Sequence, residues 1–133
     1  MLAAMSTGHA GSLTTVHANN PRECLGRLET LCMQAGLGLP SKALKENISA
    51  AVNLIIQISR LSDGSRKILY ISEVTGMQGE VISLQDVFYY KQEGLDAKRK
   101  IKGRFVPTGI IPKFVEEMEA KGMKISRGLF QAK

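Results

Sequence analysis

Two histidines and two threonine hydroxyls lie close together near the start of this 133-residue chain, between His9 and His17. An imidazole can donate or accept a hydrogen bond, and its charge changes near neutral pH. His9 and His17 are therefore candidates for acid–base chemistry or for contacting a phosphate oxygen. Thr14 and Thr15 offer hydroxyls to opposite faces of an extended segment. The residue types predict a polar site, with His17 as its strongest candidate.

The elements expected to position this site are a strand and a helix. The alternation over residues 12–17, with its β-branched residues, predicts a strand that ends at His17. In open α/β sheets, ligands bind beyond the carboxyl ends of strands. Asn20 is a good N-cap and Pro21 suits the first helical position, so a helix is expected over residues 20–35. Arg27 lies about two turns into that helix.

Two other kinds of chemistry are less well supported by this segment. An enzyme that used His9 and His17 as acid and base would need a partner carboxylate, and the nearby Glu23 and Glu29 point away on the helix. The thiols of Cys24 and Cys32 could join the histidines at a metal, but the spacing matches no known pattern. No metal site is predicted, and the two thiols are too far apart along one helix to form a disulfide.

The rest of the chain reads as alternating helices and strands, without internal repeats. A second helix is expected from Ser41 to about Val52. Residues 54–74 predict a hairpin, because Asp63-Gly64 is a turn signal between two apolar runs. Residues 80–83 and 87–90 add a third, interrupted strand. Residues 92–103 look mobile, 104–107 form a short strand, 111–121 a helix, and the tail after Lys124 looks weakly ordered. These elements predict an α/β fold with a three-stranded antiparallel meander and C-terminal helices.

The net charge of +6 is concentrated in the last third of the chain. Residues 91–133 hold eleven basic and five acidic side chains, densest from Lys98 to Arg104. Such a run can meet phosphates or an anionic lipid surface, or it can be a lysine-protected strand edge. It has no interleaved aromatic residues for stacking on bases, so no nucleic acid partner is expected. A stand-alone basic α/β module that binds nucleic acid or anionic membrane remains an alternative function.

Two long motifs carry a resemblance to a known family. The run TGHAGSLTTVHANNPRECLGRLETL, followed by ISAAVNLIIQISRLSDGSRKILYISEVTGMQGEVISLQDVF, strongly resembles the C-terminal half of the type II/type IV secretion-system ATPases. The late piece GRFVPTGIIPKF is similar to the C-terminal region of the CpaF/TadA-type motors of tight-adherence (Flp) pili. The resemblance covers about residues 1–130. It divides the chain into residues 1–90, the C-terminal portion of a RecA-like P-loop ATPase core, and residues 91–133, a basic linker with a helical segment.

The resemblance implies a motor that couples ATP hydrolysis to pilin assembly or protein secretion. The intact protein would bind ATP and Mg²⁺, assemble into a hexameric ring, and meet platform proteins at the cytoplasmic face of the inner membrane. His17 would be the histidine of the family's "His box", a γ-phosphate sensor. The resemblance further implies nucleotide-site roles for six other residues, namely Gly8, His9, Gly11, Thr14, Thr15 and Arg27.

One departure from the family governs the activity expected of this chain. No GxxxxGK[ST] phosphate loop is present, and no apolar strand ends in acidic residues that would hold Mg²⁺. Met1–Met5 resembles the end of a helix, which suggests a piece of a longer protein. We therefore expect no bound cofactor and negligible ATPase activity from these 133 residues. We also expect self-association, because a strand and helix cut from their sheet would expose apolar surface.

Overall fold

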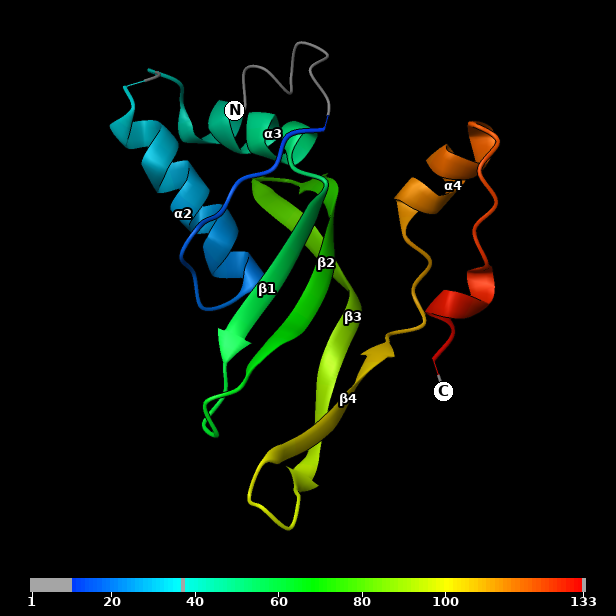
Figure 1. Ribbon diagram of the computed structural model, residues 1–133. Helices are drawn as coiled ribbons and strands as arrows, with labels where there is room; N and C mark the ends of the chain where they lie inside the picture. Colours follow the sequence, from blue (N-terminus) through cyan, green and yellow to red (C-terminus); the bar gives the residue numbers. More distant parts are fainter. Residues whose placement is uncertain (1–10, 37, 133) are drawn as a thin grey trace. The chain divides into compact units, whose positions relative to one another are not determined.

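A computed structural model describes residues 11–36 and 38–132 (Figure 1). The fold class is α/β, with helices and one antiparallel four-stranded sheet in the order β1-β2-β3-β4. The elements follow one another along the chain as α2 (Pro21–Gln34), α3 (Ser41–Ala51), β1 (Leu54–Arg60), β2 (Arg66–Gln78), β3 (Val81–Leu95), β4 (Ile101–Pro107), α4 (Lys113–Ala120) and the 3-10 helix η1 (Arg127–Phe130). In the described residues, no helix is long and apolar enough to cross a bilayer.

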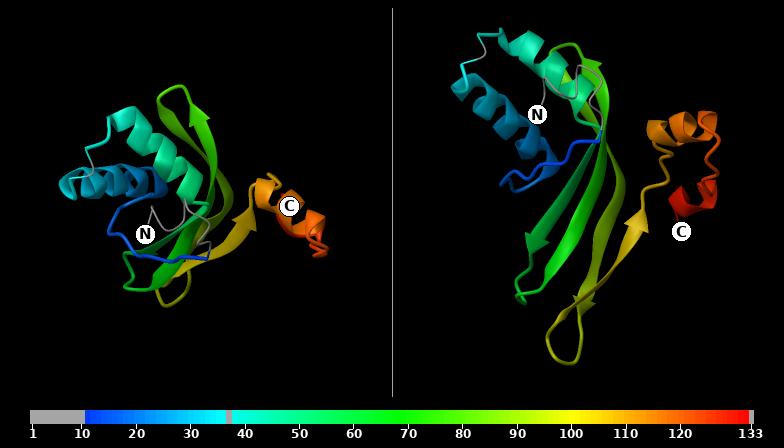
Figure 2. Two further views of the ribbon diagram at one scale, coloured as in Figure 1. Left: turned by 90° about the horizontal axis from the view of Figure 1, so that it is seen from above. Right: turned by 45° about the horizontal axis from the view of Figure 1, so that its top comes forward.

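Contacts within the chain form two compact units, and strands of the sheet contribute to both. The first unit contains the described residues up to Ile55 together with Val74–Gln85. In this unit, α2 and α3 lie on one side of its strand segments, residues 54–55, 74–78 and 81–85 (Figure 2). Their apolar stripes meet strand residues in a core made of Leu25, Leu28, Leu44, Ile48, Ile55 and Ile82. This core positions α2, and with it the segment that carries His17.

Helix α2 begins where the sequence predicts. The side chain of Asn20 accepts the backbone N–H of Glu23 at 2.8 Å, and Pro21 occupies the first turn, where a missing N–H costs nothing. The Glu23 carboxylate reaches back to the N–H of Asn19 at 3.0 Å. Helix α3 also begins at the predicted residue, Ser41. Its N-cap is Pro40, and Ser41 donates its hydroxyl to Glu29 of α2 rather than capping its own helix.

The second unit comprises residues 56–73 and 86–132. Here β3 and β4 pair antiparallel, with a bulge between Gln92 and Gly94. After β4 the chain enters α4 and η1, whose Val115 and Phe130 pack with Val87 of β3. The ring of Phe130 also lies 5.7 Å from that of Phe88, centroid to centroid. The tail after Lys124 is therefore better anchored than expected, because Phe130 is only 3% exposed.

Three expectations about strands are wrong. Residues 12–17 form no strand, and no described strand pairs with them. A β-branched pattern is not sufficient, because a strand also needs a neighbour to complete its backbone hydrogen bonds. The meander gains a fourth strand, since residues predicted to be mobile, 92–103, contribute to β3 and β4. Strand β3 also runs without the predicted interruption.

Candidate functional site

The predicted nucleotide-site residues lie on an exposed segment. Gly8 and His9 fall outside the described residues. Gly11 has a φ of +89°, which suits glycine, and Thr14, Thr15 and His17 are exposed. Val16 between them is half-buried against the core of the first unit. The segment is thus anchored by an apolar side chain and presents its polar groups outward, which is what a ligand-facing surface requires.

Two arginines of α2 have different roles. Arg27, the predicted site residue, is exposed and makes no hydrogen bond to the described residues. Arg22 instead donates from Nη1 to the carbonyl oxygen of Ile82, which ties the first turn of α2 to β3. The structure therefore leaves the guanidinium of Arg27 available for a ligand and assigns a structural contact to Arg22.

Both thiols lie on α2, and neither forms a disulfide. Cys24 and Cys32 are free and half-buried against the core of the first unit. Burial raises the pKa of the Cys24 thiol, which lowers its thiolate fraction and its reactivity near neutral pH. Among the residues that the structure describes, no three His, Cys, Asp or Glu side chains gather to hold a metal ion.

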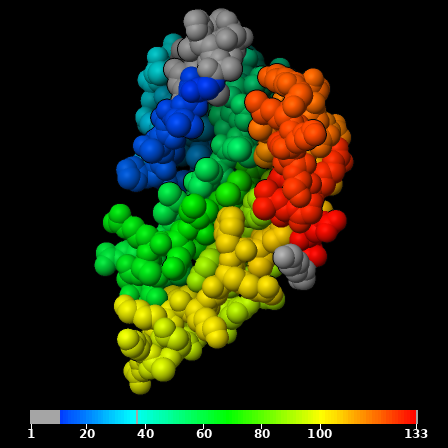
Figure 3. Space-filling model, turned by 45° about the vertical axis from the view of Figure 1, so that its right-hand side comes forward, coloured from blue at the N-terminus to red at the C-terminus, as the bar shows by residue number. Residues whose placement is uncertain are grey.

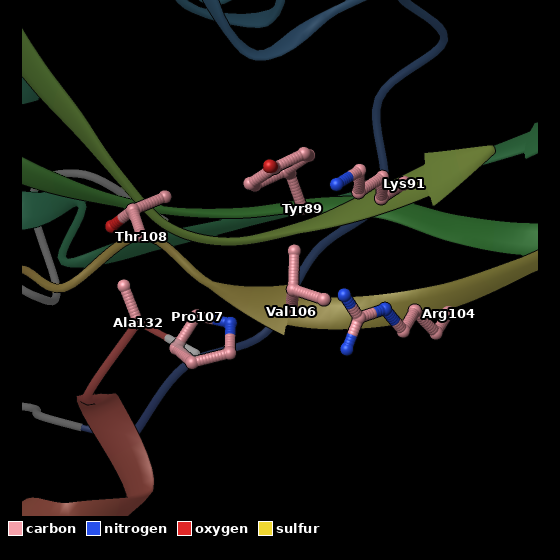
Figure 4. A pocket seen from close by; sticks show the side chains of 7 residues that line it. All are labelled: Tyr89, Lys91, Arg104, Val106, Pro107, Thr108 and Ala132. Atoms are coloured by element: carbon pink, nitrogen blue, oxygen red, sulfur yellow. The ribbon is translucent and has the colours of Figure 1, made fainter. Parts of the chain in front are cut away.

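A pocket that sequence reasoning missed lies in the second unit, on the β3–β4 hairpin. It has a volume of about 210 Å³ and is lined by Tyr89, Lys91, Arg104, Val106, Pro107, Thr108 and Ala132. Figure 4 shows Tyr89 and Lys91 rising from β3, with Val106 and Arg104 on the neighbouring strand. The alternating side-chain directions along YYKQ and GRFVP are the sequence signal for this pocket. The signal can be used only if the two runs are recognised as the paired strands of one hairpin.

The charge of this pocket is positive. Lys91 and Arg104 are directly opposite each other in the β3–β4 register, an arrangement that costs energy for like charges. Glu93 offsets part of the cost, because its carboxylate accepts from Nε of Arg104 at 2.8 Å. Glu93 thus already engages one of the two cations that line the pocket.

The turn between β3 and β4 is held in place by Asp63, in the β1–β2 loop. Its Oδ2 accepts the backbone N–H of Ile101 at 2.7 Å, and its Oδ1 accepts the N–H of Ser65 at 2.9 Å. Hydrogen bonds from Ser65 and Ile101, with the charge of Lys100 as a smaller cause, lower the pKa of Asp63 to about 2. One carboxylate thus joins two loops of the second unit.

Comparison with known protein families identifies the chain at the level of its family. The family described as type II/IV secretion system protein matches residues 1–121. The chain belongs to this family. The match includes α2, α3, all four strands and α4, so the helices and sheet described above are those of a type II/IV secretion system protein.

Individual relatives carry names from conjugal transfer. A Mycobacterium tuberculosis protein with such a name is 38% identical over 81 residues, which is 61% of this chain and 22% of that protein. The conjugal transfer protein TrbB of Rhizobium radiobacter is 38% identical over 79 residues, or 59% of this chain and 22% of that protein. The chain therefore spans about a fifth of the length of these relatives.

Proposed function

We propose that this chain is the C-terminal part of an ATP-driven motor that serves secretion, pilus assembly or conjugal transfer. The observation that carries the proposal is the family match over residues 1–121. The names of the relatives favour a transfer system. The tight-adherence pilus branch is the finer alternative, and it rests on the motifs RLSDGSRKI and EVTGM and on the later GRFVPTGIIPKF.

Within such a motor, His17 would contact the terminal phosphate side of a bound nucleotide. Its exposure, together with the neighbouring Thr14 and Thr15, fits a residue that meets a ligand rather than a core. Arg27 is equally available. Bound ATP would supply the bond that is hydrolysed, and Mg²⁺ would neutralise charge on its phosphates. The backbone amides and lysine that cradle the other phosphates are not in these 133 residues, since Lys42, Lys45 and Lys67 lack the required glycine pattern.

The proposal includes ring assembly and a place beside membrane platform proteins. Membership in the family supports both, and we expect them of the longer protein, on the cytoplasmic side of the inner membrane. For the 133 residues themselves we expect no ATP hydrolysis. The apolar surface of the sheet is also expected to promote self-association, since Ile56 and Ile58 of the edge strand β1 are 54% and 60% exposed.

The deciding experiment measures Mg²⁺-dependent ATP hydrolysis by the purified chain and by the longer gene product that contains it. We expect turnover from the longer protein alone. In that protein His17→Ala should lower kcat by about a hundredfold to a thousandfold, the usual cost of removing one contact to charge that develops in the transition state. Thr30→Ala, on the exposed side of α2, is the matched control. Metal-dependent turnover by the 133 residues, or a longer protein without a phosphate loop, would contradict the proposal.

A further inference from the structure

The tip of the β3–β4 hairpin, Leu95–Lys102, concentrates unpaired positive charge. It holds four basic residues and one acidic residue. Lys98, Arg99 and Lys102 are exposed, and none forms an ion pair with any described residue. The nearby Arg104 differs, because it pairs with Glu93. The tip therefore offers three uncompensated cations on a short stretch of chain.

The backbone of this tip is ordered by hydrogen bonds of its own. Oδ1 of Asp96 accepts the N–H groups of Lys98 and Lys100 at 2.8 and 2.9 Å, and the Asp96 N–H donates to the Lys100 carbonyl at 2.9 Å. Asp63 holds the N–H of Ile101 from outside the tip. Arg99 is the one described non-glycine residue with a positive φ, +60°. A preorganised tip loses little conformational entropy when it docks.

The tip also exposes an apolar side chain among its cations. Leu95, the last residue of β3, is 63% exposed. Within the second unit, the tip extends farther than the β1–β2 turn, as the yellow and green segments of Figures 1 and 3 show. A projecting, convex tip can contact a flat partner surface, but it offers no groove in which a peptide could bind. A leucine flanked by lysines suits the boundary between lipid headgroups and acyl chains, where the cations stay at the headgroups.

We propose that the Leu95–Lys102 tip docks on an anionic lipid bilayer, with Lys98, Arg99 and Lys102 against lipid phosphates and Leu95 below them. Nucleic acid offers the same phosphates, but this tip has no aromatic side chain to stack on bases. The proposal is independent of ATP hydrolysis. It identifies the side of the second unit that faces the membrane, and it holds whether or not the longer protein is a motor.

The first test compares two charge-matched triple variants in vesicle co-sedimentation. Lys98→Gln/Arg99→Asn/Lys102→Gln removes three of the four tip cations and keeps Lys100, whose Nζ donates to the carbonyl oxygen of Asp63 at 3.4 Å. Asparagine is chosen at position 99 because it tolerates the left-handed backbone there. Lys42→Gln/Lys121→Gln/Lys124→Gln removes three exposed cations elsewhere. With vesicles of phosphatidylserine and phosphatidylcholine, each tip cation should contribute roughly fivefold, so the tip variant should bind about a hundredfold more weakly. The control should lose under about fivefold. Equal losses would overturn the proposal.

The second test separates lipid from other phosphate carriers. Wild-type protein is titrated with phosphatidylserine vesicles, phosphatidylcholine vesicles and duplex DNA at the same salt concentration. Binding to phosphatidylserine vesicles alone is expected, with Leu95→Gln reducing it even at raised salt, because burial of an apolar side chain is not screened. Equal or tighter binding to DNA, or no effect of Leu95→Gln, would overturn the proposal. Far-ultraviolet circular dichroism checks that each exposed substitution leaves the fold intact.

Discussion

The carboxylate of Glu73, in β2, accepts the backbone N–H of Phe114 at 3.1 Å through Oε2. Its other oxygen accepts the N–H of Lys113 at 3.0 Å. Both donors belong to the first turn of α4, where no helix residue can satisfy them. The N-cap position holds Pro112, which has no side-chain acceptor, so a residue forty positions earlier caps this helix. Glu73 is only 4% exposed, and its negative charge suits a helix N-terminus.

Replacement of Glu73 should therefore loosen α4. We expect Glu73→Ala to lower the free energy of unfolding by about 2 kcal/mol, the upper end for loss of a helix cap. Glu73→Gln keeps one acceptor oxygen and should cost about half as much. Urea denaturation followed by circular dichroism measures both. Glu117→Ala, on the exposed side of α4, is the control and should change stability by under about 0.5 kcal/mol. Similar costs for Glu73→Ala and Glu117→Ala would contradict the capping role.

The low pKa of Asp63 predicts an acid-dependent contribution to stability. In the folded chain the pKa is about 2, below the ordinary value of 3.8. The unfolded state therefore takes up a proton first as the pH falls, so the stabilisation is complete above the unfolded pKa and is lost between about pH 4 and pH 2. Wild-type protein should be more stable than Asp63→Asn at neutral pH, and the difference should shrink across that window. Urea midpoints at several pH values measure it. A constant difference would show that the Asp63 carboxylate is not hydrogen-bonded as described.

Replacement of glycine by alanine should have opposite effects on stability at two positions. A Cβ on Gly103 in β4 would lie 2.5 Å from the carbonyl oxygen of Lys91 and 2.7 Å from Cζ of Tyr90, so either backbone or ring must move. We expect Gly103→Ala to destabilise by about 1–3 kcal/mol. A Cβ on Gly26 in α2 meets no atom within 4 Å, and Gly26→Ala should stabilise by about 0.5–1 kcal/mol. Thermal unfolding of both variants tests the local packing, and a neutral Gly103→Ala would contradict it.

The parts of the fold that sequence reasoning predicted are those with local signals. Helix α2 is specified by Asn20, Pro21 and Glu23 within four residues, and the β1–β2 turn by Asp63 and its following glycine. The β3–β4 hairpin lacks such a signal, because its turn is charged and depends on a hydrogen bond from a distant loop. The capping of α4 by Glu73 likewise joins residues forty positions apart, which no periodicity can reveal.

The candidate site shows the same division. Exposure of Thr14, Thr15 and His17 agrees with a ligand-facing segment, but the strand predicted for residues 12–17 is not formed. A strand also needs a partner for its backbone hydrogen bonds, and none of the described strands pairs with residues 12–17. The role of His17 as a phosphate sensor stays a prediction, as do the roles of Gly11 and Arg27. The Lys91–Arg104 pocket was missed because it needs the register of two strands.

Arg22 and Arg27 give a matched pair within one helix. Arg22 donates to the carbonyl oxygen of Ile82, so Arg22→Ala should destabilise the chain by about 1 kcal/mol, the worth of a typical hydrogen bond. Arg27 is exposed and makes no such bond, so Arg27→Ala should change the free energy of unfolding by under about 0.5 kcal/mol. For ATP hydrolysis by the longer protein we expect the opposite ranking. Arg27→Ala should lower the rate more than Arg22→Ala, because the guanidinium of Arg27 is available to a nucleotide and that of Arg22 is held by Ile82. Urea denaturation of the 133 residues and ATP hydrolysis by the longer protein measure the two effects. If Arg27→Ala leaves hydrolysis unchanged, α2 contributes no arginine to the nucleotide site.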